Sequence, residues 1–127
     1  MRPEKILADF DRALGQLASA LETPAETDLI KAGCIQYFEF CFELAWKAIK
    51  AVASELGLEC NSPRACLKLA FQQGWIDDET LWLAMLEARN RMSHTYHAEN
   101  ALAIYARLQD FLRAMQELHA RLRSMER

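Results

Sequence analysis

Apolar residues recur three and four positions apart over most of this chain, the pattern typical of amphipathic helices. The first such stretch covers residues 3–22 and begins at Pro3, a residue favoured in the first helical turn. The second extends from residue 27 or 28 to residue 56, where Gly57 suits a left-handed helix end. The residues expected on its buried side are Ile30, Cys34, Tyr37, Phe38, Cys41, Leu44, Ala45, Ala48, Ile49 and Val52.

Three further helices are predicted in the second half of the chain. Ser62-Pro63 reads as an N-cap followed by proline, and it begins a short helix that ends at Gly74. A fourth helix, capped by Asp77 or Asp78, extends to about His94. The last is predicted as one continuous helix over residues 98–125. Its expected buried positions are Leu102, Ile104, Tyr105, Leu108, Phe111, Leu112, Met115, Leu118 and Leu122.

Four long helices and one short helix, joined by brief turns, predict an all-α protein. We expect a single domain over residues 1–127, folded as an antiparallel up-and-down bundle. The apolar content is high for so small a bundle, and the aromatic residues cannot all face inward on narrow stripes. We therefore expect a homodimer or another partner to cover part of this set: Phe40, Phe42, Trp75, Trp82 and Tyr105.

Composition narrows the class of protein. No run of about 18 apolar residues is present, and the charged start has no apolar block after it, so we expect neither a membrane span nor a signal peptide. The four cysteines, at positions 34, 41, 60 and 66, lack the paired spacing of a metal site. Cys34 and Cys41 lie two turns apart on one apolar helix face and read as small buried residues. Reduced thiols would suit a cytoplasmic protein. The three histidines do not have the spacing of metal ligands either, and no metal or other cofactor is expected; His119 is expected to be solvated.

The net charge of −3 argues against a protein that coats nucleic acid without sequence preference, but this charge is unevenly distributed. Residues 89–127 contain seven arginines and four acidic residues, a net charge of +3. Residues 1–88 contain eight basic and fourteen acidic residues, a net charge of −6. The basic end of the chain is also the end that carries the most distinctive motif.

That motif is the run Arg89-Asn90-Arg91-Met92-Ser93-His94-Thr95-Tyr96. A guanidinium can neutralise charge on a phosphodiester, and an imidazole can transfer a proton near neutral pH. On a regular helix Arg89 and His94 differ in direction by about 140°, whereas Asn90 and His94 share a face. The alternative is a structural role: arginine and histidine are common at the C-terminal end of a helix because their positive charge complements the helix dipole. The local pattern alone favours this alternative.

A second polar cluster lies on the predicted second helix and comprises Gln36, Glu39, Glu43, Trp46 and Lys47. The simple explanation is a solvated face with a Glu43–Lys47 pair four residues apart, worth a few tenths of a kcal/mol. The alternative is that these carboxylates are partly buried and hold Arg89 or Arg91 in place across the bundle. The pattern supports both interpretations equally.

The chain is similar to a known family in three blocks: residues 36–47, Ser62-Pro63-Arg64 and residues 89–96. Arg89-x-x-x-x-His94-x-Tyr96 resembles the signature of the HEPN superfamily. The whole pattern more closely resembles the bacterial nucleotidyltransferase substrate-binding proteins, which are related to the HepT toxins. The resemblance spans nearly the whole chain in the same order, so it is more specific than the short signature.

This resemblance implies a dimeric helical bundle whose partner is a separate minimal nucleotidyltransferase. It implies a metal-independent ribonuclease toxin in which Arg89 and His94 act on an RNA or nucleotide substrate. It also implies that Tyr96 is a candidate for modification with AMP by the partner. Asn90, Glu39, Glu43, Trp46 and Lys47 would then orient the catalytic pair or bind substrate.

Two other hypotheses are kept. The first is a non-catalytic subunit that uses the same polar residues to hold a substrate or to dock the transferase. The second is a plain helical interaction domain, in which Arg89, His94 and Tyr96 would point apart.

Overall fold

The computed structural model describes residues 3–94 and 98–126, and all regular secondary structure within these ranges is helical. There are six helices in this part of the chain. Their bounds are α1 (Pro3–Glu22), α2 (Asp28–Glu55), α3 (Pro63–Gln72), α4 (Glu79–His94), α5 (Ala98–Ala106) and α6 (Leu108–Ser124).

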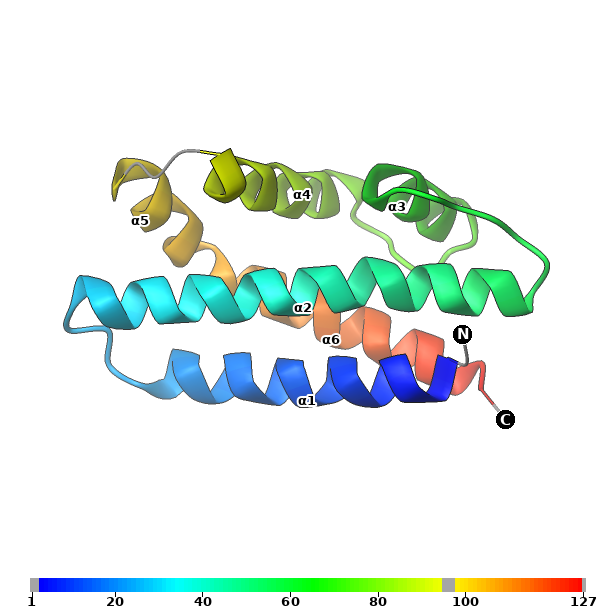
Figure 1. The fold of residues 1–127 in the computed structure, drawn as a ribbon, viewed down its shortest axis with the longest axis horizontal. Helices are drawn as coiled ribbons and strands as arrows, with labels where there is room; N and C mark the ends of the chain where they lie inside the picture. Colours follow the sequence, from blue (N-terminus) through cyan, green and yellow to red (C-terminus); the bar gives the residue numbers. More distant parts are fainter. Residues whose placement is uncertain (1–2, 95–97, 127) are drawn as a thin grey trace.

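The helices form an antiparallel bundle in which successive segments of the chain run in alternating directions (Figure 1). Helices α1 and α2 lie side by side and antiparallel, and α6 packs against both. Helices α3 and α4 follow one another along α2 and form the third segment of the bundle. Helix α5 continues into α6, and together they form the fourth segment. The predicted up-and-down bundle is therefore confirmed, with α2 as the helix that contacts all the others.

Local sequence signals set most of the helix ends. The Thr27 and Ser62 hydroxyls accept hydrogen bonds from the backbone of Ile30 (3.2 Å) and Ala65 (3.1 Å), as N-caps do. Asp78 caps the start of α4 in the same way, with Leu81 as donor at 3.0 Å. Gly57 and Gly74 both have positive φ, 77° and 78°, immediately after α2 and α3. These predicted boundaries are confirmed to within one or two residues.

The predicted final helix is wrong in one respect, because it is broken at Arg107. This residue has φ −102° and ψ −1°, and its amide bonds to the carbonyl of Ile104 at 3.0 Å, a three-residue turn. The break lets α5 lie over one end of α2 while α6 turns to pack between α1 and α2. Neither glycine nor proline marks the break, so the sequence pattern did not reveal it.

The five aromatic residues are not all buried in the core, as expected, although most of them are. Phe42, Trp75 and Trp82 are 0%, 6% and 2% exposed, and Tyr105 is half-buried. They fit because α2 is covered on more than one side, so that Phe42 meets Trp82 of α4. Phe40 alone of the five is well exposed, at 49%.

Two positions expected in the core are instead on the surface. Tyr37 is 36% exposed and Leu102 is 49% exposed. The fully buried large side chains come from five helices and are Phe10, Phe38, Phe42, Phe111, Leu7, Leu17, Ile49, Leu67, Met85, Leu108, Met115 and Leu118.

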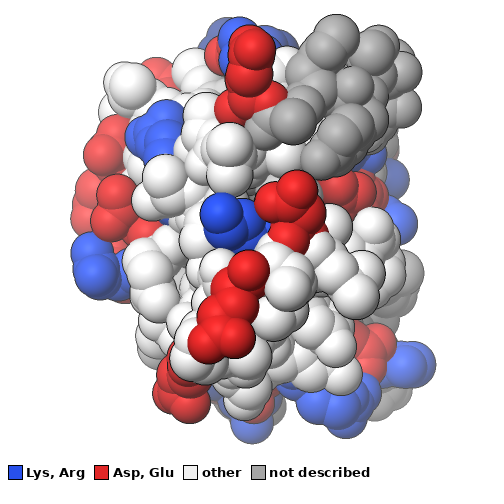
Figure 2. Space-filling view, turned by 90° about the vertical axis from the view of Figure 1, so that its left-hand side faces the viewer, with Lys and Arg blue, Asp and Glu red and all other residues white. Residues whose placement is uncertain are grey.

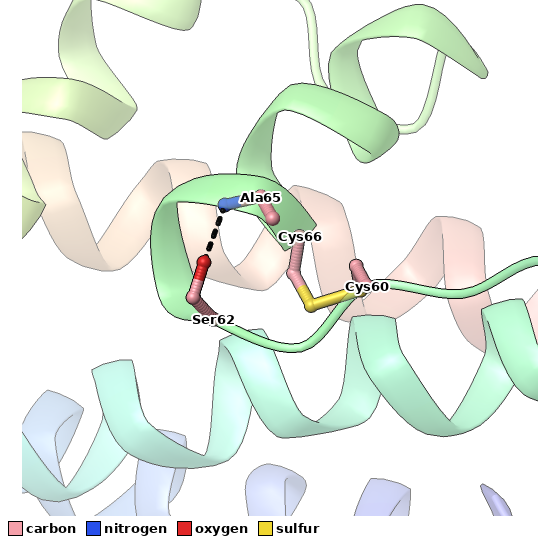
Figure 3. The surroundings of a disulfide bond; sticks show 4 residues. All are labelled: Cys60, Ser62, Ala65 and Cys66. Atoms are coloured by element: carbon pink, nitrogen blue, oxygen red, sulfur yellow. Dashed lines mark hydrogen bonds between the residues drawn. A yellow bond between two sulfur atoms is a disulfide. The ribbon is translucent and has the colours of Figure 1, made fainter.

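The cysteines divide into two pairs with different chemistry. Cys34 and Cys41 are buried free thiols in α2, as expected, and burial raises the pKa of Cys41 to about 12. Cys60 and Cys66 instead form a disulfide between the α2–α3 connection and the first turn of α3, beside the Ser62 cap (Figure 3). The expectation of four reduced thiols is wrong for this pair, whose Cα atoms lie 5.0 Å apart. The cytoplasmic location that rested on reduced thiols stays a prediction. No helix in the described ranges is long and apolar enough to cross a membrane.

Candidate functional site

Arg89 lies near the C-terminal end of α4 and reaches across to α2. Its guanidinium pairs with Oε1 of Glu43, and both side chains are about one third exposed. A second guanidinium nitrogen donates to the side-chain oxygen of Asn90 at 3.2 Å. The end of α4 is therefore tied to the middle of α2 by a charge-assisted contact between helices.

Glu43 is the centre of this polar cluster. Its Oε2 accepts a hydrogen bond from the indole nitrogen of Trp46 at 3.2 Å, and Nζ of Lys47 lies 3.9 Å from the same oxygen. Both partners follow Glu43 on α2 at the three- and four-residue spacing of one helix face. The Glu43–Lys47 pair and the pair across the bundle coexist, so both interpretations of this cluster hold in part.

Glu39 lies one turn before Glu43 and is half-buried. Burial raises the pKa of its carboxyl group, the charge of Arg89 lowers that pKa, and the charge of Glu43 raises it. Glu39 is therefore close enough to the Arg89–Glu43 pair to share its electrostatic field.

Arg91 does not take part in this contact between helices. It pairs with Glu87 on its own helix at 2.5 Å, and both side chains are more than half exposed. A pair of this kind contributes little to stability. Of the two arginines considered for the positioning role, only Arg89 meets a carboxylate of α2.

The remaining motif residues are only partly described. The backbone of His94 is the last residue of α4, but its side chain, like Tyr96 as a whole, lies outside the described residues. Whether Arg89, His94 and Tyr96 converge therefore stays a prediction.

His119, which was expected to be solvated, is half-buried instead. Its Nε2 lies 3.0 Å from the carbonyl oxygen of Leu7, and its ring meets Phe10 edge-on at 5.5 Å. This histidine belongs to the packing of α6 against α1, a contact that its polar sequence neighbours concealed. In the described part of the chain no group of three or more His, Cys, Asp or Glu side chains is arranged to hold a metal ion.

A hollow of about 300 Å³ lies beside the polar cluster, between α2, the end of α4 and α5. Glu39 lines it together with Gln36 from α2, Met92 from α4 and Leu102 from α5. Sequence reasoning did not identify Met92 and Leu102, because only the fold brings them to Glu39.

Comparison with known proteins relates the chain to a family. The model of the family described as "Nucleotidyltransferase substrate binding protein like" matches residues 5–124. Over 90 residues the chain is 38% identical to the Haemophilus influenzae protein named "Probable ribonuclease HepT". That match covers 67% of this chain and 62% of the relative, so the chain spans less than two thirds of the relative's length.

Two solved structures share the fold. A Thermus thermophilus protein is 35% identical, with a TM-score of 0.84 over 90% of this chain and 98% of the other. A Haemophilus influenzae protein is 30% identical, with a TM-score of 0.79 over 92% and 98% of the two chains. The latter is described as revealing the fold of a substrate-binding domain of a nucleotidyltransferase.

Proposed function

Because the chain belongs to the nucleotidyltransferase substrate-binding protein family, we propose that it is a HepT-like partner of a separate minimal nucleotidyltransferase. In this proposal it is a toxin that cleaves RNA without a metal ion, through Arg89 and His94. The observation that carries the proposal is the Arg89–Glu43 ion pair, which holds the arginine five residues before His94 on α4.

The reaction uses the nucleophile that RNA itself carries. The 2′-hydroxyl loses its proton and attacks the adjacent phosphorus, and the bond from phosphorus to the 5′-oxygen breaks. The products are a 2′,3′-cyclic phosphate and a 5′-hydroxyl, which takes up one proton. His94 serves these proton transfers, and Arg89 stabilises the charge that develops on the non-bridging oxygens.

The neighbouring residues position this pair. Glu43 fixes the guanidinium of Arg89, and Trp46 and Lys47 in turn hold the Glu43 carboxylate. Asn90 accepts a hydrogen bond from Arg89 and orients it from the same helix. Tyr96 is the proposed residue that the transferase modifies with AMP to silence the toxin.

A homodimer is part of the proposal, and one face of α2 supports it. Leu29, Gly33, Tyr37 and Phe40 follow one another at steps of four, four and three residues, which places them on one stripe. Leu29 is 82% exposed, Tyr37 36% and Phe40 49%. Pairing two such stripes would cover this apolar surface and bring the two motif ends near each other.

The test is RNA cleavage in EDTA by wild type, Arg89→Ala and His94→Ala. We expect both variants to lose about 10²-fold or more of the rate, and Glu43→Gln to lose less because it only positions Arg89. Arg91→Ala is the matched control, since Arg91 lies two residues away and pairs within its own helix. Circular dichroism confirms that each variant folds. Equal cleavage by wild type, Arg89→Ala and His94→Ala would rule out this assignment.

A non-catalytic substrate-binding subunit is the second candidate, and the same ion pair favours it in one respect. Glu43 already compensates much of the charge of Arg89, which suits holding a ligand more than stabilising new negative charge. Expression of the chain alone in bacteria separates the two candidates. A toxin arrests growth and is rescued by the co-expressed transferase, whereas a binding subunit leaves growth unchanged.

A further inference from the structure

The hollow beside the Arg89–Glu43 pair has two unlike sides. The polar side comes from α2, where Gln36 and Glu39 lie one turn apart and the charged residues Asp28 and Lys31 line the hollow nearer the start of the helix. Ile35 of α2, Met92 of α4 and Leu102 of α5 supply apolar walls. Its volume of about 300 Å³ lies at the lower end of the range for ligand pockets, which suits one planar ring system rather than a longer ligand.

The hollow lies directly beside the proposed cleavage site. Met92 is one turn after Arg89 on α4, and Glu39 is one turn before Glu43 on α2. Glu39 and Met92 both line the hollow, and the charge of Arg89 acts on the Glu39 carboxyl group. A group bound in the hollow would therefore be next to a phosphate held by Arg89.

The surrounding surface does not favour phosphate binding over a broad area. Among the described residues, the end of the molecule that carries α5 and the start of α2 shows basic and acidic side chains interspersed on an uncharged background (Figure 2). Selectivity at this end must therefore come from particular contacts in the hollow, and not from a positive surface.

We propose that this hollow is a base-binding subsite that selects guanine next to the scissile phosphate. The inference rests on the proposed function and names its substrate specificity. The guanine ring lies between the apolar walls, with Met92 suited to the contact through its polarisable sulfur. Its Watson–Crick edge faces Gln36 and Glu39.

Guanine is favoured because of the hydrogen-bonding groups that a carboxylate can satisfy. An ionised carboxylate only accepts hydrogen bonds, and it has two oxygens to do so. Guanine presents two adjacent donors, N1–H and the N2 amino group, whereas adenine, cytosine and uracil each present a donor next to an acceptor. Burial raises the pKa of the Glu39 carboxyl group, and the charge of Arg89 lowers it and so favours the ionised form that this contact requires.

The experiment measures binding of four nucleoside 5′-monophosphates by isothermal titration calorimetry, with GMP, AMP, CMP and UMP as probes. We expect GMP to bind about tenfold more tightly than each of the others, the discrimination typical of a good bidentate contact. Glu39→Gln should abolish the preference, because an amide replaces one acceptor with a donor. Glu55→Gln, an exposed glutamate at the far end of α2, is the matched control and should keep the preference.

A second variant protects the test against misfolding of the first. Ala32→Trp adds bulk at an exposed position on the rim of the hollow and should block GMP binding while the helical spectrum stays unchanged. Equal affinity for all four nucleotides, no binding, or a GMP preference that survives Glu39→Gln would each overturn the subsite. GMP binding without RNA cleavage would refute only the nuclease, and cleavage without GMP binding would refute only the subsite.

Discussion

Glu43 connects most of the polar chemistry in this molecule. It contacts Arg89 across the bundle, and it contacts Trp46 and Lys47, which follow it on α2 by three and four residues. An ion pair that is one third exposed contributes modestly to stability, since solvent screens it. Its main effect is therefore to fix where the guanidinium lies.

Burial disfavours the ionised form of Glu39, one turn away, in the folded state. This predicts that Glu39 makes the protein less stable as pH rises. Its carboxyl pKa is raised above 4.5, mainly by burial. Below the pKa that Glu39 has in the unfolded chain, its carboxyl group is protonated in both states. As pH rises from that value through the higher pKa of the folded state, the unfolded state becomes relatively more stable. Glu39→Gln removes this penalty, so we expect a melting temperature on the order of 2 °C above wild type at pH 7.

Thermal melts of wild type and Glu39→Gln between pH 4 and pH 8 check this prediction, with Glu55→Gln as the control that should show no such trend. The difference should shrink as pH falls toward about 4.5. A variant less stable than wild type at pH 7, or a pH-independent difference, would contradict it.

At the scale of single elements, α3 depends on a covalent link as well as on its cap. The helix has only ten residues, and helices of that length are marginal without tertiary support. Ser62 caps it, Cys66 is fully buried in it, and the Cys60–Cys66 disulfide ties its first turn to the connection from α2.

Reduction of this disulfide should lower the free energy of unfolding. Closing a loop with a sequence separation of six restricts the unfolded chain by about 2 kcal/mol in the entropic model. Urea unfolding of the oxidised and reduced protein measures the difference. The Cys60→Ala/Cys66→Ala variant is the control, and its stability should not change with dithiothreitol. Wild-type stability that is insensitive to reductant would refute this role.

At the scale of the whole molecule, α2 is the central helix, and it carries an exposed apolar stripe. The half of α2 nearest α5 carries the exposed Leu29, Tyr37 and Phe40, whereas the other half, residues 42–55, carries no exposed large apolar side chain. This asymmetry is what a surface shared between two copies would produce.

Phe40→Asp should therefore weaken self-association. We expect wild type to sediment as a dimer and Phe40→Asp as a monomer at the same concentration, because a carboxylate would be buried in the interface. Phe71→Asp is the matched control, since Phe71 is a similarly exposed phenylalanine (42%) on α3. A wild-type monomer at high concentration would refute the dimer, and a dimer that persists in Phe40→Asp would place its interface elsewhere.

Much of this fold could be predicted from local sequence. Thr27, Ser62 and Asp78 mark helix starts, and Gly57 and Gly74 mark helix ends, because capping and positive φ depend on a few neighbouring atoms. The same reasoning failed at Arg107, where the chain turns between α5, which packs on α2 and α4, and α6, which packs on α1 as well. It failed at His119 because the contact with Leu7 joins opposite ends of the chain.

The sequence by itself determined the helical class, most helix boundaries, the motif at residues 89–96 and the family, since these depend on periodicity, caps and residue order. Tertiary structure alone decided that Glu43 meets Arg89 and not Arg91. It also decided that Cys60 pairs with Cys66, and that Glu39, Met92 and Leu102 line one hollow. These contacts depend on how helices cross and rotate about their axes, which small packing energies summed over the whole core determine.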